Sequence, residues 1–241
     1  MKNPAAGGGR WVEVPPERFV SWIVTFAERH GGADGVAAAW AVPPAGNDGC
    51  VTFSAADGAT AECHPPFASA ASLAALLPFR ERAEALAAHA AADRTVGVLL
   101  VRLGGFAAGV FSGSPPRLVV SKTGSRPVHG RSAAGGWSQQ RFARRRENQV
   151  ATALRAAADA AVAVFGRYGP DRLDAVVLGG DKRSAAGLAD DARLEKYLAK
   201  ATSRFLTVPD PRLAVLRDIP RAFLATRIRL TEPESNSPVT G

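Results

Sequence analysis

The stretch from Lys122 to Arg146 accounts for most of the net charge of the chain. It holds seven Lys and Arg side chains and no Asp or Glu, whereas all 241 residues together have a formal net charge of +8. Like charges repel one another, so a purely structural surface rarely excludes the opposite sign over so long a stretch. The pattern is typical of a surface that binds nucleic-acid phosphates. The basic residues are Lys122, Arg126, Arg131, Arg141, Arg144, Arg145 and Arg146.

The centre of this stretch combines small residues with polar ones. Ser132 to Gly136 has only small side chains, so its backbone can approach a ligand closely. Trp137, Gln139 and Gln140 follow directly, and none of them has an evident role in a hydrophobic core. We therefore predict a flexible loop tip that presents polar groups to RNA.

A helix is predicted to begin directly after this loop. Ser138 can cap its N-terminus, because a serine hydroxyl accepts a hydrogen bond from a backbone N–H of the first turn. Four polar residues then share one face at spacings of i, i+3, i+4 and i+7, namely Arg141, Arg144, Arg145 and Asn148. Apolar residues continue at helical spacing: Phe142, Val150, Leu154, Ala157, Ala161, Val164 and Phe165. A glycine tip on such a helix can enter a narrow space lined by RNA.

These motifs resemble a known catalytic loop. His129-Gly130-Arg131, then Gly135-Gly136, then Arg141-Phe142-Ala143-Arg144 resembles the Gly-Gly-Gln loop and following helix of archaeal and eukaryotic peptide-chain release factors. The order is most similar to the actinobacterial branch of the Vms-like release factors, relatives of the eukaryotic ribosome-quality-control hydrolase that frees nascent chains from stalled large subunits. The resemblance covers about residues 92–230 and implies an RNase H-like fold there.

Two features of the loop differ from the release-factor pattern. Ser132 to Ala134 are inserted before the glycines, and Trp137 occupies the position of the glutamine. Vms-like members carry Gly-Gly-x-Gln variants, so the displaced glutamine is Gln139 or Gln140. We favour Gln139 because it is nearer the glycine tip, and Gln140 stays open as the alternative.

The resemblance implies a ribosome-dependent peptidyl-tRNA hydrolase. Peptidyl-tRNA holds the peptide as an ester, and ester hydrolysis needs a positioned water and a stabilised oxyanion. A glutamine amide and the backbone N–H groups near Gly135 and Gly136 can supply both. The implied partners are the large ribosomal subunit, its RNA and peptidyl-tRNA, and neither a cofactor nor a metal ion is expected. The implied RNA-binding residues are Lys122, Arg126, His129, Arg131, Trp137, Arg141, Arg144, Arg145 and Arg146.

Two other functions compete with this one. The displaced glutamine favours a non-catalytic module that binds RNA or the ribosome. The eukaryotic relatives are also associated with cleavage of the tRNA acceptor end, which makes an endonuclease the third hypothesis. Asp174, Asp181, Asp190 and Asp191 form no convincing catalytic pair in the sequence, and we interpret them as helix caps and surface acids.

The composition indicates a globular protein. Hydrophobic residues make up 46% and charged residues 22% of the chain. No apolar run is long enough to span a membrane, and the first residues lack the apolar stretch of a secretory signal. We therefore expect a cytoplasmic monomer without a membrane partner. Cys50 and Cys63 are interpreted as reduced thiols, because a zinc site would need His64 and a further ligand.

The order of predicted elements indicates an α/β protein, α+β overall, with two folded parts. Residues 10–91 are predicted to form a small α+β unit that ends in a helical linker, and its role is either docking on the ribosome or tRNA or completing the fold. Residues 92–230 are predicted to form the release-factor-like catalytic domain, a mixed sheet covered by helices. Residues 1–9 and 231–241 are rich in small, polar or proline residues, so flexible ends are expected.

Individual elements follow from apolar periodicity and from Gly and Pro positions. In the first part we predict strands at 10–14, 36–42, 50–54 and 60–63, and helices at about 16–30 and 73–92. In the second part we predict strands at 96–103, 106–111, 117–121, 173–178 and 205–208, helices at 138–168 and 183–200, and a last strand or helix at 222–230. Gly179-Gly180, between a strand and a helix, is interpreted as a tight turn.

Overall fold

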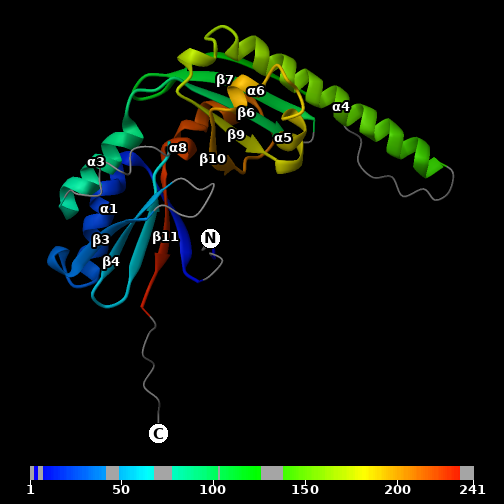
Figure 1. The fold of residues 1–241 in the computed structure, drawn as a ribbon. Helices are drawn as coiled ribbons and strands as arrows, with labels where there is room; N and C mark the ends of the chain where they lie inside the picture. The colour runs from blue at the N-terminus through cyan, green and yellow to red at the C-terminus, as the bar shows by residue number, and fades with distance from the viewer. Residues whose placement is uncertain are drawn as a thin grey trace. The chain divides into compact units, whose positions relative to one another are not determined.

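The structure is a computed structural model that describes residues 3–4, 8–41, 49–67, 78–102, 104–125 and 138–233. Side chains in the first part of the long helix are described only for Arg144 and from Glu147 onward. The chain divides into two compact units (Figure 1). The first comprises Met1–Ala92 together with Leu224–Gly241, and the second comprises Asp93–Phe223.

The first unit is built on a six-stranded antiparallel sheet. Its strand order is β1-β2-β11-β5-β4-β3. The strands are β1 (Asn3–Pro4), β2 (Arg10–Val14), β3 (Val36–Ala41), β4 (Cys50–Ala55), β5 (Thr60–His64) and β11 (Thr226–Thr231). Side chains alternate between the two faces, as in β5, where Ala61 and Cys63 are fully buried and their neighbours are not.

Two helices cover one face of this sheet. Helix α1 (Pro16–Arg29) begins with a proline, whose fixed φ suits the first turn, and buries Phe19, Ile23 and Phe26. Helix α3 (Phe79–Ala91) begins directly after Pro78, and Ala83 and Leu86 enter the same core. The 3-10 turn η1 (Ala33–Gly35) connects α1 to β3. The core therefore lies between these helices and one face of the sheet.

The cysteines of the first unit are reduced. Cys50 and Cys63 are both free and buried. Burial raises the pKa of each thiol, and for Cys63 the rise is large because the side chain is fully enclosed. Cys63 belongs to the core under α1 and α3, whereas Cys50 lies on the opposite face of the sheet, as strand alternation from the core residue Val51 requires.

The second unit is built on a five-stranded mixed sheet. Its strand order is β10-β9-β6-β7-β8. The strands are β6 (Val96–Arg102), β7 (Gly105–Ser112), β8 (Arg117–Ser125), β9 (Ala175–Gly180) and β10 (Ala201–Leu206). β6, β7 and β8 form an antiparallel meander. On the other side of β6, β9 pairs with β6 in parallel, and β10 pairs with β9 in parallel. This is the mixed, RNase H-like sheet that the sequence predicted.

Helices cover both faces of the second sheet. Alanines and Phe165 of α4 (Ser138–Phe165) pack with Leu99 and Val110 on one face. On the other face, Leu216 contacts Gly109 and Phe223 packs against Phe111. The remaining helical elements are η3 (Pro170–Arg172), α5 (Lys182–Leu188), α6 (Glu195–Leu198), α7 (Leu213–Asp218) and α8 (Pro220–Leu224). β6 is consequently buried on both sides, which explains its continuous apolar sequence.

The predicted helix at 183–200 is wrong in one respect, because the structure breaks it into α5 and α6. The carboxylate of Asp191 accepts a hydrogen bond from the backbone N–H of Arg193 at 3.1 Å and holds its guanidinium at 2.7 Å. Such a local bond competes with helical pairing of the backbone. The strand expected at 205–208 begins earlier, as β10, and the sequence pattern did not predict α7.

The end of the chain also differs from the prediction. The catalytic domain was expected to extend to residue 230, but β11 pairs with β2 and β5 and so belongs to the first unit. At the other end, Asn3 and Pro4 were expected to be flexible and instead pair with Trp11 and Arg10. The expected flexible tail lies outside the described residues from 234 onward.

None of the helices in the described segments combines the length and the apolar character that a bilayer crossing requires.

Candidate nucleic-acid interface

The structure describes the two elements that flank the predicted RNA-binding loop. β8 ends at Ser125 and α4 begins at Ser138, where the sequence predicted a helix start. The loop residues of the predicted site lie outside the described residues, namely Arg126, His129, Arg131, Gly135, Gly136 and Trp137. What the structure fixes is therefore where the loop leaves the sheet and where it joins the helix.

The approach to the loop is an edge strand. Among the described strands of the second sheet, β8 pairs only with β7. Lys122 of β8 lies opposite Ala108 of β7. Lys122 is exposed, and it forms no ion pair with the residues that the structure describes. Lysines on edge strands discourage pairing with other sheets. Here the same position also adds a free cation next to the loop.

Both candidate glutamines lie in the first turn of α4. Gln139 and Gln140 follow Ser138 directly and have helical backbones. The first backbone N–H groups of a helix have no partner within it, and the helix dipole makes this end partly positive. Either amide is thus carried at an end of the helix that favours negative charge. Arg141, Arg144, Arg145 and Arg146 follow on the next turns.

The first half of α4 stands clear of its own sheet (Figure 1). Arg144, Glu147 and Asn148 are exposed, and continuous burial begins only near Ala153. Val150, one of the apolar residues at helical spacing, does not anchor the helix, because its side chain is 38% exposed. At 1.5 Å per residue, the fifteen residues from Ser138 to Thr152 form an arm of about 22 Å, and its described side chains are exposed except for the half-buried Gln149.

The second half of α4 fixes the direction of this arm. Ala157, Ala161 and Phe165 are fully buried against the sheet. Gly187 of α5 lies so close to Leu154 that an added Cβ would meet its side chain at 2.7 Å. On the surface, Asp159 accepts a hydrogen bond from Arg193 at 2.8 Å. A packed base and an exposed tip give a rigid support for the loop.

A shallow basic pocket lies where β8 meets the loop. It has a volume of about 460 Å³ and its polar lining comes from Arg102, Thr123, Ser125, Asp210 and Arg212. Arg102 donates to the backbone carbonyl of Val208 at 2.8 Å and forms no ion pair in the described part of the chain, whereas Arg212 forms an ion pair with Asp210 at 3.9 Å. Two guanidinium groups and two hydroxyls can bind a phosphate group.

Sequence reasoning missed Arg102 and Arg212. Arg102 ends a buried strand and Arg212 precedes a helix that was not predicted, so no charge cluster linked them. The available signal was an arginine at the end of an otherwise apolar strand, since such a charge must reach solvent or a ligand.

The acidic residues of the second unit have structural roles. Asp181 caps α5 and accepts from the backbone N–H and the hydroxyl of Ser184, both at 2.8 Å. Asp174 accepts from the backbone N–H of Thr95 at 2.7 Å. Gly180 has φ +110°, and a Cβ there would meet the carbonyl of Val101 at 1.9 Å, so the turn requires glycine. The prediction of a helix cap is confirmed for Asp181, and the prediction of a tight turn at Gly179-Gly180 is confirmed as well.

The Actinobacteria/chloroflexi VLRF1 release factor model matches residues 94–229. The matched segment includes the meander, the loop, the arm of α4 and the first part of β11. It covers more than half of the chain. The chain belongs to this release factor family. The predicted resemblance is therefore confirmed.

Two archaeal structures are similar to this chain. The crystal structure of the archaeal translation termination factor aRF1 has 13% sequence identity and a TM-score of 0.39, with 89% of this chain and 66% of that chain covered. A structure described as an archaeal protein has 13% identity and a TM-score of 0.33, with 86% and 62% covered. This chain thus spans slightly less than two thirds of either relative. No curated protein matches its sequence.

Proposed function

We propose that this chain is a ribosome-dependent peptidyl-tRNA hydrolase that releases nascent peptides from stalled large subunits. The observation that supports it best is the exposed basic arm of α4, which carries Gln139 and Gln140 in its first turn. A release factor must bring a water-orienting group into a space enclosed by RNA. An arm of about 22 Å that projects beyond its sheet suits this task.

The charged residues hold the arm on RNA. Arg144 is exposed and forms no ion pair with the described residues, so its guanidinium is available to a phosphate. Lys122 and the pocket with Arg102 and Arg212 lie at the other end of the loop. Contacts on both sides of the loop hold it in a fixed position relative to the peptidyl ester. The binding energy of these contacts thus serves to orient the reacting groups.

Hydrolysis then needs one water molecule and no covalent enzyme intermediate. The glutamine amide orients the water, whose oxygen attacks the ester carbonyl carbon. The unpaired N–H groups at the start of α4 and the loop backbone stabilise the oxyanion that forms. The bond to the ribose oxygen breaks, this oxygen takes up a proton, and the peptide leaves with a free carboxyl group. Isolated protein should be nearly inactive, because RNA forms most of the site.

Binding without catalysis is the second candidate. Trp137 stands where release factors have glutamine, and both glutamines are placed in a helix rather than at the glycines. A module with these features can occupy the peptidyl-transferase region without hydrolysing the ester. Cleavage of the tRNA acceptor end stays the third candidate, and its product differs from both.

One experiment separates the three candidates. Large subunits carrying labelled peptidyl-tRNA are incubated with the wild-type chain, Gln139→Ala, Gln140→Ala and the control Thr152→Ala. Thr152 is exposed on the same helix and bonds only to the carbonyl of Asn148 in the described contacts. We expect free peptide and intact tRNA with wild type and the control, and loss of release with Gln139→Ala.

The other outcomes reassign the function or the residue. Loss only in Gln140→Ala moves the catalytic role by one position. Peptide attached to a short nucleotide end identifies an endonuclease. Binding with no product from any variant identifies a non-catalytic module and overturns the proposal.

A further inference from the structure

The first unit contains a group of three metal-ligating side chains that the proposed function does not use. Cys50 lies on β4, and Glu62 and His64 lie on β5. In the antiparallel register Val51 pairs with Cys63, so Cys50 is placed opposite His64. Cys63, between Glu62 and His64, points into the core, so these three residues share the face that α1 and α3 do not cover.

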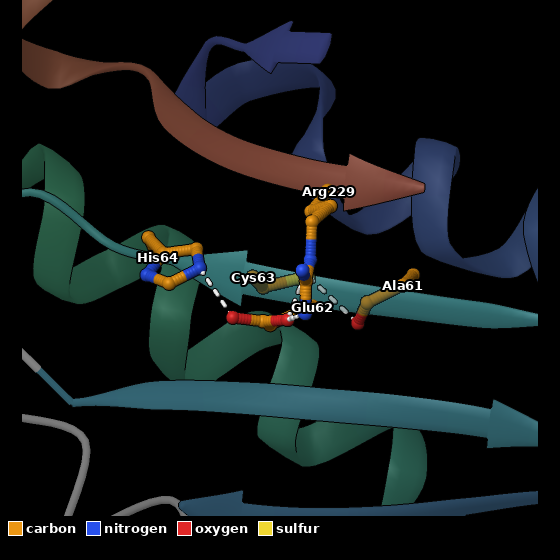
Figure 2. A network of polar contacts seen from close by, with 5 residues as sticks. All are labelled: Ala61, Glu62, Cys63, His64 and Arg229. Carbon is orange, nitrogen blue, oxygen red and sulfur yellow. Dashed lines mark hydrogen bonds and ion pairs between the residues drawn. The ribbon is translucent and has the colours of Figure 1, made fainter. Parts of the chain in front are cut away.

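The donor atoms of these residues are close together. The Cys50 sulfur, a carboxylate oxygen of Glu62 and a ring nitrogen of His64 all lie within 4.8 Å of one another. His64 Nε2 is 2.9 Å from Glu62 Oε1. Figure 2 shows His64 and Arg229 reaching the carboxylate of Glu62 from two sides. The side chains of Glu62 and His64 are 22% and 26% exposed, so an ion can enter from solvent.

We propose that Cys50, Glu62 and His64 bind a zinc ion. Thiolate, imidazole and carboxylate are the three ligand types that zinc uses in proteins. Tetrahedral coordination places such donors about 3.3 to 3.6 Å apart, so the side chains need to move by only about 1 Å from their present positions. Three protein ligands leave the fourth position to water or to a donor from a partner.

Arg229 completes the arrangement from outside. Its Nε donates to Glu62 Oε2 at 2.9 Å, and its second nitrogen contacts the same oxygen. Glu62 Oε1 is left to face His64 and the ion. A partner of this kind orients a ligating carboxylate and strengthens the site. On binding, the Cys50 thiol gives one proton to solvent and His64 Nε2 offers its lone pair, so thiolate and carboxylate balance the two charges of Zn²⁺.

A purely structural network is the competing explanation of the same contacts. Glu62, His64 and Arg229 can stabilise the sheet by hydrogen bonds alone. That explanation predicts no saturable metal binding, and Cys50 then serves only as a hydrogen-bonding partner of Glu62 and Thr52. The two cysteines provide a matched pair, because both are buried and on neighbouring strands but face opposite sides of the sheet.

The test uses Co²⁺ as a spectroscopic probe for zinc, on the full chain after chelator treatment. We expect one equivalent of Co²⁺ to produce a thiolate-to-metal charge-transfer band in the near ultraviolet, and Zn²⁺ to displace it. Cys50→Ser should abolish the band, whereas Cys63→Ser should keep it. His64→Gln should weaken binding, and Arg229→Gln should raise the dissociation constant about 10-fold to 100-fold.

Circular dichroism establishes that each variant is folded before titration. If Cys50→Ser does not fold, Cys50→Ala and His64→Gln replace it, and zinc-dependent thermal stabilisation of wild type and Cys63→Ser gives a second readout. Absence of the band in the wild type overturns the proposal. So does an unchanged band in the folded Cys50 variant, or a band that depends on Cys63. The outcome is independent of peptide release, which this site does not carry out.

Discussion

Shortening the exposed arm of α4 should abolish peptide release without unfolding the protein. Deleting residues 149–152 removes four helical residues, which withdraws the tip by about 6 Å and rotates it by about 40°. Thr152 is exposed and Val150 is 38% exposed, so the deletion removes little buried surface. We expect the free energy of unfolding to change by less than about 1 kcal/mol, as for surface changes that leave the core intact.

The effect on catalysis should be much larger than the effect on stability. A misplacement of about 1 Å can cost about 100-fold in rate, so a shift of about 6 Å should lower the single-turnover release rate at least that much. The matched control replaces Gln149, Val150 and Thr152 by alanine and keeps the length of the helix. The assay is peptide release from large subunits at saturating protein, with thermal unfolding of both variants. Normal release by the shortened arm would refute the reasoning, because it would show that α4 does not set the position of the glutamine.

Three further predictions concern binding and stability. Arg144→Ala and Lys122→Ala should each reduce the slope of log binding constant against log salt for large subunits by about 0.7 to 1, as measured by sedimentation; an unchanged slope would place the RNA contacts elsewhere. Gly180→Ala should destabilise the second unit by at least about 3 kcal/mol in urea unfolding, because its Cβ would meet the carbonyl of Val101 at 1.9 Å and φ is +110°. A hydrogen bond from the backbone N–H of Ala59, and secondarily one with His30, lowers the pKa of Asp57 from its ordinary 3.8. The ionised carboxylate therefore stabilises the folded protein fully above that value, and this stabilisation is lost as pH falls through the lower folded pKa. Asp57→Asn should therefore flatten the fall in stability as pH drops from about 4 through the lower folded pKa, and an identical pH profile in the variant would contradict this.

Elements with strong local signals were predictable from the sequence. Pro16 and the spacing of Phe19, Ile23 and Phe26 are enough to place α1. The apolar run from Val96 predicts β6, because a strand that is buried on both faces has a continuous apolar sequence. Ser138 marked the start of α4, although the exposure of Val150 depends on how far the sheet extends beneath the helix.

Features that depend on pairing between distant segments were not predictable. The alternation of apolar and polar residues in β11 predicts a strand. The sequence around β11 does not indicate that this strand pairs with β2 and β5. The proximity of Cys50 to His64 follows from the register of β4 and β5, which the intervening turn determines. Arg102 and Arg212 meet at one pocket only because the end of β6 lies beside the segment that follows β10. A charge pattern read along the chain does not contain this information.

The place of β11 in the first sheet has a consequence for the order in which the chain folds during synthesis. β11 lies between β2 and β5, yet it is the last of the described strands to be made, more than 200 residues after β2. The second unit, Asp93–Phe223, is complete before β11 leaves the ribosome. β2 and β5 must wait with unpaired edges until then, since the strand that joins them does not yet exist. We therefore expect the inserted unit to fold first and the N-terminal sheet to close last, the reverse of the order of translation.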